Sequence, residues 1–181
     1  GGGRWRGCGR ALGLGRVRAE RGLLGRACRE VVCGGLADPA ALKGGIGGCD
    51  AVSHAGAIYE VGLSGPRRLD MYEANVNGTE HLLAAAFAVG VPKVVYVSSI
   101  VVFGDTKGVV VDETYERNAA DGFTSYYDET NTLAHRMALG FGERGLPVVI
   151  AQPGQIYGPG DHSGIGALLR RAAAGKLPVL T

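Results

Sequence analysis

The chain has 181 residues, 46% of them hydrophobic, which is enough for one globular domain with a sizeable core. Its net charge is only +2, and the eight Arg of residues 1–30 are interleaved with Gly beside one aromatic residue, Trp5, so the composition argues against a nucleic-acid partner. It also offers no apolar run of about 18 residues, no signal peptide and no close C-x-x-C pair, so we expect a cytoplasmic protein without a metal site or a membrane partner.

Residues 1–30 show neither strand alternation nor a clear helical stripe before Ala19. We expect an atypical Gly/Arg-rich segment, with disorder as one interpretation and an out-of-frame reading of GC-rich coding sequence as another. Gly9, Gly13 and Gly15 resemble a phosphate-binding turn, but only 21 residues separate Gly9 from Val31, and a βαβ unit needs about 30 or more. The sequence therefore predicts no working phosphate loop here, no first strand, and a domain of residues 31–181.

From residue 31 onward, short apolar runs alternate with amphipathic segments. The run EVVC, residues 30–33, reads as a strand, and Asp38 followed by Pro39 is typical of an N-cap and first helical residue. Residues 50–57 read as a strand that runs into small residues. Between residues 68 and 89, apolar side chains recur at three- and four-residue steps, which predicts an amphipathic helix that ends at Gly90.

The second half of the chain continues this alternation. Residues 93–99, KVVYVSS, form a nearly continuous apolar run, as in a strand that is buried on both faces of a parallel sheet. A loop, a helix over 125–144, a strand over 146–153 and a final helix follow. We therefore expect an α/β fold with a doubly wound parallel sheet, Rossmann-like and incomplete at the N-terminus. Ligands of such sheets bind at the carboxyl ends of the strands.

Five sequence blocks carry a resemblance to a known family. In chain order they are GGLADPAAL (34–42), DAVSHAGA (50–57), NVNGT (75–79), VYVSSIVVFG (95–104) and QPGQIYGPGD (152–161). Together they resemble the extended short-chain dehydrogenases/reductases of the NAD-dependent epimerase/dehydratase group. The resemblance implies a partial dinucleotide-binding domain, an NAD or NADP cofactor and a small-molecule substrate, such as a sugar nucleotide, that reacts at a hydroxyl or carbonyl. It also implies a homodimer through the helices of residues 68–89 and 125–144.

The same resemblance implies roles for individual residues. Tyr127 would be the general acid/base that moves the hydroxyl proton, and Ser99 would hydrogen-bond the reacting oxygen. Asn75 would lie near the nicotinamide and hold local backbone, and the small residues 55–57 would let the backbone approach the cofactor closely. The expected cofactor-binding residues are Leu36, Ala55, Gly56, Ala57, Asn75, Ser98, Tyr127, Pro153 and Ile156.

Asn131 is the main departure from the family pattern. It lies four residues after Tyr127, on the same helical face, where the family has a Lys. A tyrosine has an ordinary pKa near 10, and a neighbouring positive charge is needed to lower it. We therefore expect an NAD(P)-dependent epimerase, dehydratase or reductase that is impaired by Asn131. The alternatives are a non-catalytic NAD(P)-binding or sensor protein on the same fold, and a non-functional gene fragment.

Overall fold

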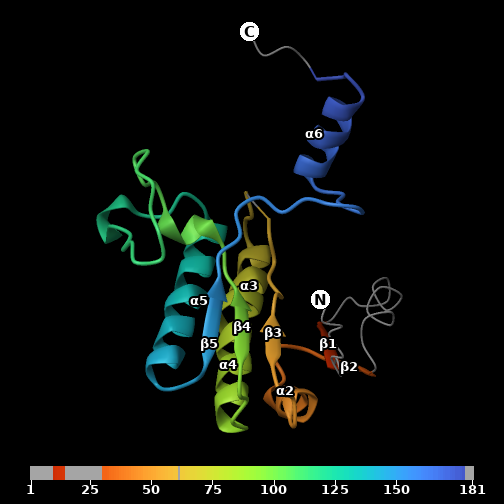
Figure 1. Ribbon diagram of the computed structural model, residues 1–181, viewed down its shortest axis with the longest axis vertical. Coiled ribbons are helices and arrows are strands. Elements are labelled where there is room, and N and C mark those ends of the chain that lie inside the picture. The colour runs from red at the N-terminus through yellow and green to blue at the C-terminus, as the bar shows by residue number, and fades with distance from the viewer. Residues whose placement is uncertain (1–9, 15–29, 61, 178–181) are drawn as a thin grey trace, which may run out of the picture.

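Parallel strands form the centre of the molecule in two groups. The structure, a computed structural model, describes residues 10–14, 30–60 and 62–177 (Figure 1). In the first group β1 (Arg10–Leu14) pairs with β2 (Glu30–Gly34); in the second the order is β3 (Val52–His54), β4 (Val94–Val97), β5 (Val148–Ala151). All pairings between the described strands are parallel, so the expected α/β architecture is confirmed.

Strand β1 differs from the sequence-based expectation. No strand was predicted within residues 1–30, and that prediction is wrong, because Arg10–Leu14 pairs along its whole length with β2. Backbone pairing with a partner strand stabilises this segment, and composition does not reveal such pairing. The strand covers residues 10–14 of the stretch between Gly9 and Gly15, and the rest of the predicted absence of a phosphate loop lies outside the described residues. The expected disorder of residues 1–9 and 15–29 lies outside the described residues.

Helix α2 (Pro39–Ile46) connects the two groups of strands, since it contacts β1, β2 and α4. It begins where the sequence predicted: the Asp38 carboxylate accepts hydrogen bonds from the backbone N–H groups of Ala40 and Ala41, both at 3.0 Å. Its inner face buries Leu42 completely, beside Ile46. Such burial stabilises the fold by about 1.5–3 kcal/mol for one side chain of this size.

The predicted helix over residues 68–89 is one continuous helical rod in three parts. These are α3 (Pro66–Tyr72), a π-helical turn η1 (Glu73–Asn77) and α4 (Gly78–Ala88). At the start of α4 the backbone passes so close to Leu36 that a Cβ on Gly78 would lie 2.7 Å from the Leu36 Cβ. Only glycine fits this contact without a shift of the neighbouring backbone.

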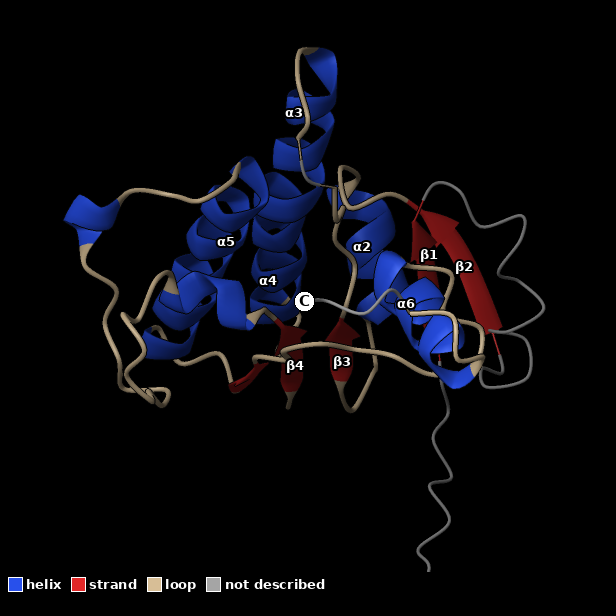
Figure 2. Cartoon of the chain, turned by 90° about the horizontal axis from the view of Figure 1, so that it is seen from above, coloured by secondary structure: helices blue, strands red, loops and turns tan. Residues whose placement is uncertain are grey.

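Helix α5 (Tyr126–Glu143) is the other long helix, and its bounds agree with the expected 125–144. Ser125 caps it, accepting a hydrogen bond from the Asp128 N–H at 3.1 Å. Figure 2 shows α4 and α5 side by side on the same side of β3 and β4. The core lies between these layers and is formed by Leu82, Leu83, Val94, Ala134, Ala138, Phe141 and their neighbours.

Shorter elements complete the described chain. A 3₁₀ turn η2 (Ile100–Phe103) follows β4, a second one η3 (Ala119–Asp121) lies in the long loop, and α6 (Gly164–Ala173) follows β5. Within the described residues, none of the helices combines the length and the apolar character that a bilayer crossing requires.

Candidate functional site

The carboxyl ends of β3, β4 and β5 bring the sequence-predicted residues to one edge of the sheet. The parallel register aligns His54 with Tyr96 and Val97 with Ala151. Residues 55–57, Ser98 and Ser99, and Pro153 therefore leave the sheet at the same level. This is the edge at which parallel α/β sheets bind ligands.

Ser99 and Tyr127 meet at this edge. Ser99 follows β4 and caps η2, accepting a hydrogen bond from the Val101 N–H at 3.3 Å. Tyr127 lies in the first turn of α5, and its side chain is half-buried. Burial raises the pKa of the Tyr127 phenol above its usual value, and hydrogen bonding with the Ser99 side chain opposes that rise. The phenol is therefore protonated near neutral pH and has a hydroxyl neighbour.

Asn131 is buried below Tyr127, with 4% of its surface exposed. Its Nδ2 donates a hydrogen bond to the Tyr127 backbone carbonyl at 2.9 Å, and its side chain also acts to lower the pKa of the phenol. Because an amide carries no charge, it lowers this pKa less than an ammonium group would. The net pKa shift of Tyr127 is upward.

Asn75 lies in η1 and holds the loop that follows β3. Its Oδ1 accepts from the Ile58 N–H at 2.7 Å, and its Nδ2 donates to the Ile58 carbonyl at 3.0 Å and to Thr130 Oγ1 at 3.3 Å. The side chain is buried, with 3% exposed. Asn75 thus ties the loop after β3 to the helix that carries Tyr127, and it does hold local backbone as expected.

Two residues expected to bind the cofactor direct their side chains elsewhere. The Ser98 Oγ lies 3.0 Å from Nδ1 of His135, a residue of α5, and Ser98 is buried. Leu36 is also buried and packs against the backbone at Gly78, while its carbonyl accepts a hydrogen bond from His81 Nδ1 at 2.9 Å. Any contact of Leu36 or Ser98 with a cofactor would therefore have to come from the backbone.

The remaining expected residues are accessible at the sheet edge. Ala55 and Ala57 are exposed, Gly56 and Pro153 are half-buried, and Ile156 is 71% exposed. Next to Pro153, the Gln152 Nε2 atom is buried and has no hydrogen-bond partner among the described residues. A buried donor of this kind calls for a partner that the described part of the chain does not supply.

A buried ion pair near Tyr127 was not foreseen from the sequence. Arg117 Nη1 and Nη2 donate to the two carboxylate oxygens of Asp128 at 2.5 and 3.0 Å, with 7% and 0% of the two side chains exposed. Burial acts to raise the pKa of Asp128, but hydrogen bonds from Arg117 and Thr124 outweigh burial and hold that pKa below its usual range. In the sequence, Asp128 reads only as a favourable charge in the first turn of a helix.

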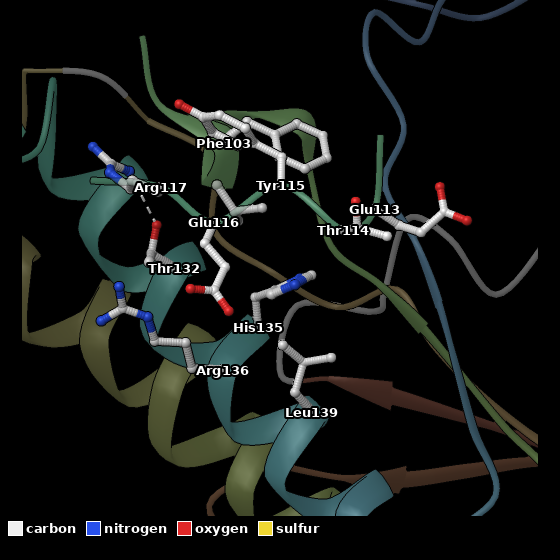
Figure 3. A pocket seen from close by; sticks show the side chains of 11 residues that line it. Phe103, Glu113, Thr114, Tyr115, Glu116, Arg117, Thr132, His135, Arg136 and Leu139 are labelled. Carbon is white, nitrogen blue, oxygen red and sulfur yellow. Dashed lines mark hydrogen bonds between the residues drawn. The ribbon is translucent and has the colours of Figure 1, made fainter. Parts of the chain in front are cut away.

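A cavity of about 460 Å³ lies along another face of α5 (Figure 3). Neither Ser99 nor Tyr127 lines it, and its wall includes His135, the partner of Ser98. The loop of residues 113–117 forms the facing wall. The full lining is Val102, Phe103, Glu113, Thr114, Tyr115, Glu116, Arg117, Thr132, His135, Arg136 and Leu139.

Comparison with known proteins shows the family of the chain. A model of the NAD dependent epimerase/dehydratase family matches residues 10–181. A 2-alkyl-3-oxoalkanoate reductase from Stenotrophomonas maltophilia is 34% identical over 149 residues, covering 80% of this chain and 43% of the relative. A 3 beta-hydroxysteroid dehydrogenase/Delta 5-->4-isomerase from Mycobacterium tuberculosis is 33% identical, covering 83% of this chain and 42% of the relative.

Among solved structures, a dTDP-glucose 4,6-dehydratase double mutant from Streptomyces venezuelae with NAD bound superposes with a TM-score of 0.72. It is 25% identical, and the match covers 92% of this chain and 52% of that one. The chain thus spans less than half the length of the two relatives and about half of this structure.

Proposed function

Because the chain belongs to the NAD dependent epimerase/dehydratase family, we propose that it forms the cofactor-binding and proton-transferring part of an oxidoreductase or epimerase. Its substrate would be a small molecule that reacts at a hydroxyl or carbonyl. The observation that carries the proposal is the meeting of Ser99 and Tyr127 at the carboxyl ends of the strands, from two elements 28 positions apart in the sequence.

Tyr127 would move the proton in this reaction. Its phenol would donate a proton to the carbonyl oxygen during reduction, and the Ser99 hydroxyl would donate a hydrogen bond to the same oxygen. The raised pKa of Tyr127 keeps the phenol protonated at neutral pH, which favours its action as an acid over its action as a base. Bound NAD or NADP would supply hydride exchange at its nicotinamide ring.

The residues at the strand ends fit the nicotinamide end of such a cofactor. The segment 55–57 is small and accessible, Asn75 fixes the loop that follows it, and Gln152 Nε2 is a buried donor without a partner among the residues that the structure describes. Pro153 and Ile156 lie next to that donor in the chain. Within the described residues 10–14, the Gly-containing stretch is strand β1, so these five residues supply no phosphate-binding turn.

Asn131 is the reason to propose weak turnover. The family Lys would supply a positive charge beside the phenol, whereas the Asn131 amide donates to a backbone carbonyl and carries no charge. The same observation favours a second candidate, a non-catalytic NAD(P)-binding or sensor protein on this fold. A non-functional gene fragment is the remaining alternative.

The test compares the chain with Asn131→Lys, each titrated with NADH by fluorescence and assayed for carbonyl reduction. A Lys at position 131 is expected to lower the pKa of Tyr127 by about 1–3 and to tighten NADH binding. Leu133→Lys is the matched control, since it adds the same charge on another face of α5. NADH binding with turnover restored only by Asn131→Lys supports an impaired enzyme. Binding that Asn131→Lys leaves unchanged supports the sensor, and no binding by any variant refutes both.

We also propose a homodimer through α3–α4 and α5. These helices lie side by side on one face of the sheet (Figure 1), and they leave Leu69 and Phe87 69% and 41% exposed. Apolar side chains on neighbouring helices are typical of a dimer interface. Light scattering of the chain and of Leu69→Glu tests this: a monomeric wild-type chain at tens of micromolar refutes the dimer.

The cytoplasmic setting stays a prediction from the sequence.

A further inference from the structure

Tyr59 lies directly against the reacting phenol although nothing in the sequence motifs points to it. Its ring meets the Tyr127 ring edge-on, with centroids 4.8 Å apart and planes at 88°. At the same time 71% of Tyr59 is exposed. The Tyr59 ring is therefore in contact with Tyr127, and most of its remaining surface is open to a molecule that approaches the phenol.

The backbone that carries Tyr59 is held in place. Both backbone polar groups of the preceding residue, Ile58, are hydrogen-bonded to the buried amide of Asn75 at 2.7 and 3.0 Å. Asn75 in turn donates to Thr130, three residues after Tyr127 on α5. The ring of Tyr59 thus has a preset position relative to the phenol, so a ligand need not spend binding energy on ordering the loop.

An exposed aliphatic side chain follows Ser99 in the chain. Ile100 follows Ser99 directly, and 49% of its surface is exposed. Its Cδ1 lies 3.4 Å from the position that a Cβ on Gly154 would occupy, so Ile100 faces the loop after β5. Ile100 is therefore an exposed aliphatic side chain between Ser99, its neighbour in the chain, and the loop after β5.

Two basic side chains that flank this region are already paired. Arg117 forms an ion pair with Asp128 at 2.5 Å. Arg67 forms an ion pair with Glu60, the residue after Tyr59, also at 2.5 Å. Pairing with a carboxylate leaves these guanidinium groups a weaker attraction for a phosphate group of a substrate. Neither of these two guanidinium groups therefore favours a phosphate-bearing ligand at the reacting pair.

We infer that the substrate carries an apolar body, an aromatic ring or an alkyl group, that lies on Tyr59 and Ile100 while its carbonyl or hydroxyl reaches Ser99 and Tyr127. This inference rests on the proposed function for the reacting pair. It makes Tyr59 and Ile100 specificity-determining residues and disfavours a sugar nucleotide as the substrate.

The experiment measures binding to the full chain without cofactor, so that it does not depend on NADH binding. Saturation-transfer NMR titrations would use 4-phenyl-2-butanone, an aryl ketone, and UDP-glucose as the polar comparison. We expect the ketone to bind and Tyr59→Ala to weaken it about 5-fold, the loss expected for one aromatic contact. Tyr59→Phe keeps the ring and should bind like the wild type. Leu168→Ala, which removes a 53% exposed side chain of α6, is the matched control.

Each outcome decides the matter. Ketone binding that depends on the ring at position 59 supports the inference, whatever the NADH titration gives. No ketone binding, equal binding by Tyr59→Ala and the wild type, or UDP-glucose binding that Tyr59→Ala abolishes would overturn it. A failed NADH titration beside ring-dependent ketone binding would instead locate the failure in the proposed function.

Discussion

His54 is expected to make the stability of the fold depend on pH. It ends β3 and is buried, with 2% exposed, and its Nε2 lies 2.9 Å from Thr79 Oγ1. The single Thr79 hydroxyl proton is donated to the Asn75 carbonyl at 2.7 Å, so His54 must donate through Nε2–H. Burial lowers the pKa of His54 to about 4 from its usual 6.5. A second proton on this ring is therefore unfavourable in the folded state.

The sign and size of the change in folding stability with pH follow from the pKa of His54. Above pH 6.5 the ring is neutral in both states, and between pH 6.5 and 4 the unfolded chain binds a proton that the folded chain does not bind. Stability is therefore lost as pH falls through this window, by about 3 kcal/mol between pH 7 and pH 4. Because the lowered pKa of His135 acts in the same direction, a variant is needed to isolate His54.

The variant is His54→Gln, whose amide can donate to Thr79 and does not titrate. Urea unfolding of both proteins from pH 7 to pH 4, followed by circular dichroism, gives the free energy of unfolding at each pH. Between pH 7 and pH 4 the free energy of unfolding of the wild type should fall by about 3 kcal/mol more than that of His54→Gln. This expectation does not depend on how much the stabilities of the two proteins differ at pH 7. Parallel pH profiles for the two proteins would refute the buried, neutral His54.

Three further changes test packing and capping by urea unfolding. Arg117→Met should destabilise the fold by about 3–5 kcal/mol because it leaves Asp128 buried without its ion partner. The double change with Asp128→Asn should recover part of that loss. If the effects of the two single changes on the free energy of unfolding simply add in the double variant, the pairing is contradicted. Gly78→Ala should cost about 1–3 kcal/mol through contact with Leu36, and Leu36→Ala in the same chain should reduce that cost. Ser125→Ala should cost about 1 kcal/mol, and no loss would show that its cap hydrogen bond is dispensable.

The sequence predicted most of the regular elements because their signals are local. Asp38 and Pro39 begin α2, apolar spacing marks α3–α4 and α5, and the apolar runs become β4 and β5. A cap, a helical period or a buried strand is determined by residues within a few positions of one another. Strand β1 was missed because its stabilising partner, β2, begins 20 positions after it does.

For the site, the sequence by itself determined the identity and spacing of the groups that we propose to react. Tyr127 and Asn131 are one helical turn apart. At this position Asn131 has an uncharged amide where the family has the positive charge of a Lys. The five ordered blocks also place the chain in its family, which the match over residues 10–181 confirms. Motifs of this kind are stretches of contiguous sequence and can be recognised without coordinates.

Only the tertiary structure decided what surrounds those groups. It places the Tyr59 ring on Tyr127, joins Arg117 to Asp128, and turns Ser98 toward His135 and away from the open edge of the sheet. These contacts join residues 11 to 68 positions apart, which no local pattern encodes. Their partners are chosen by the packing of α5 and the loops against the strand ends, because a buried polar or aromatic group is stabilised by whichever groups the fold brings within reach.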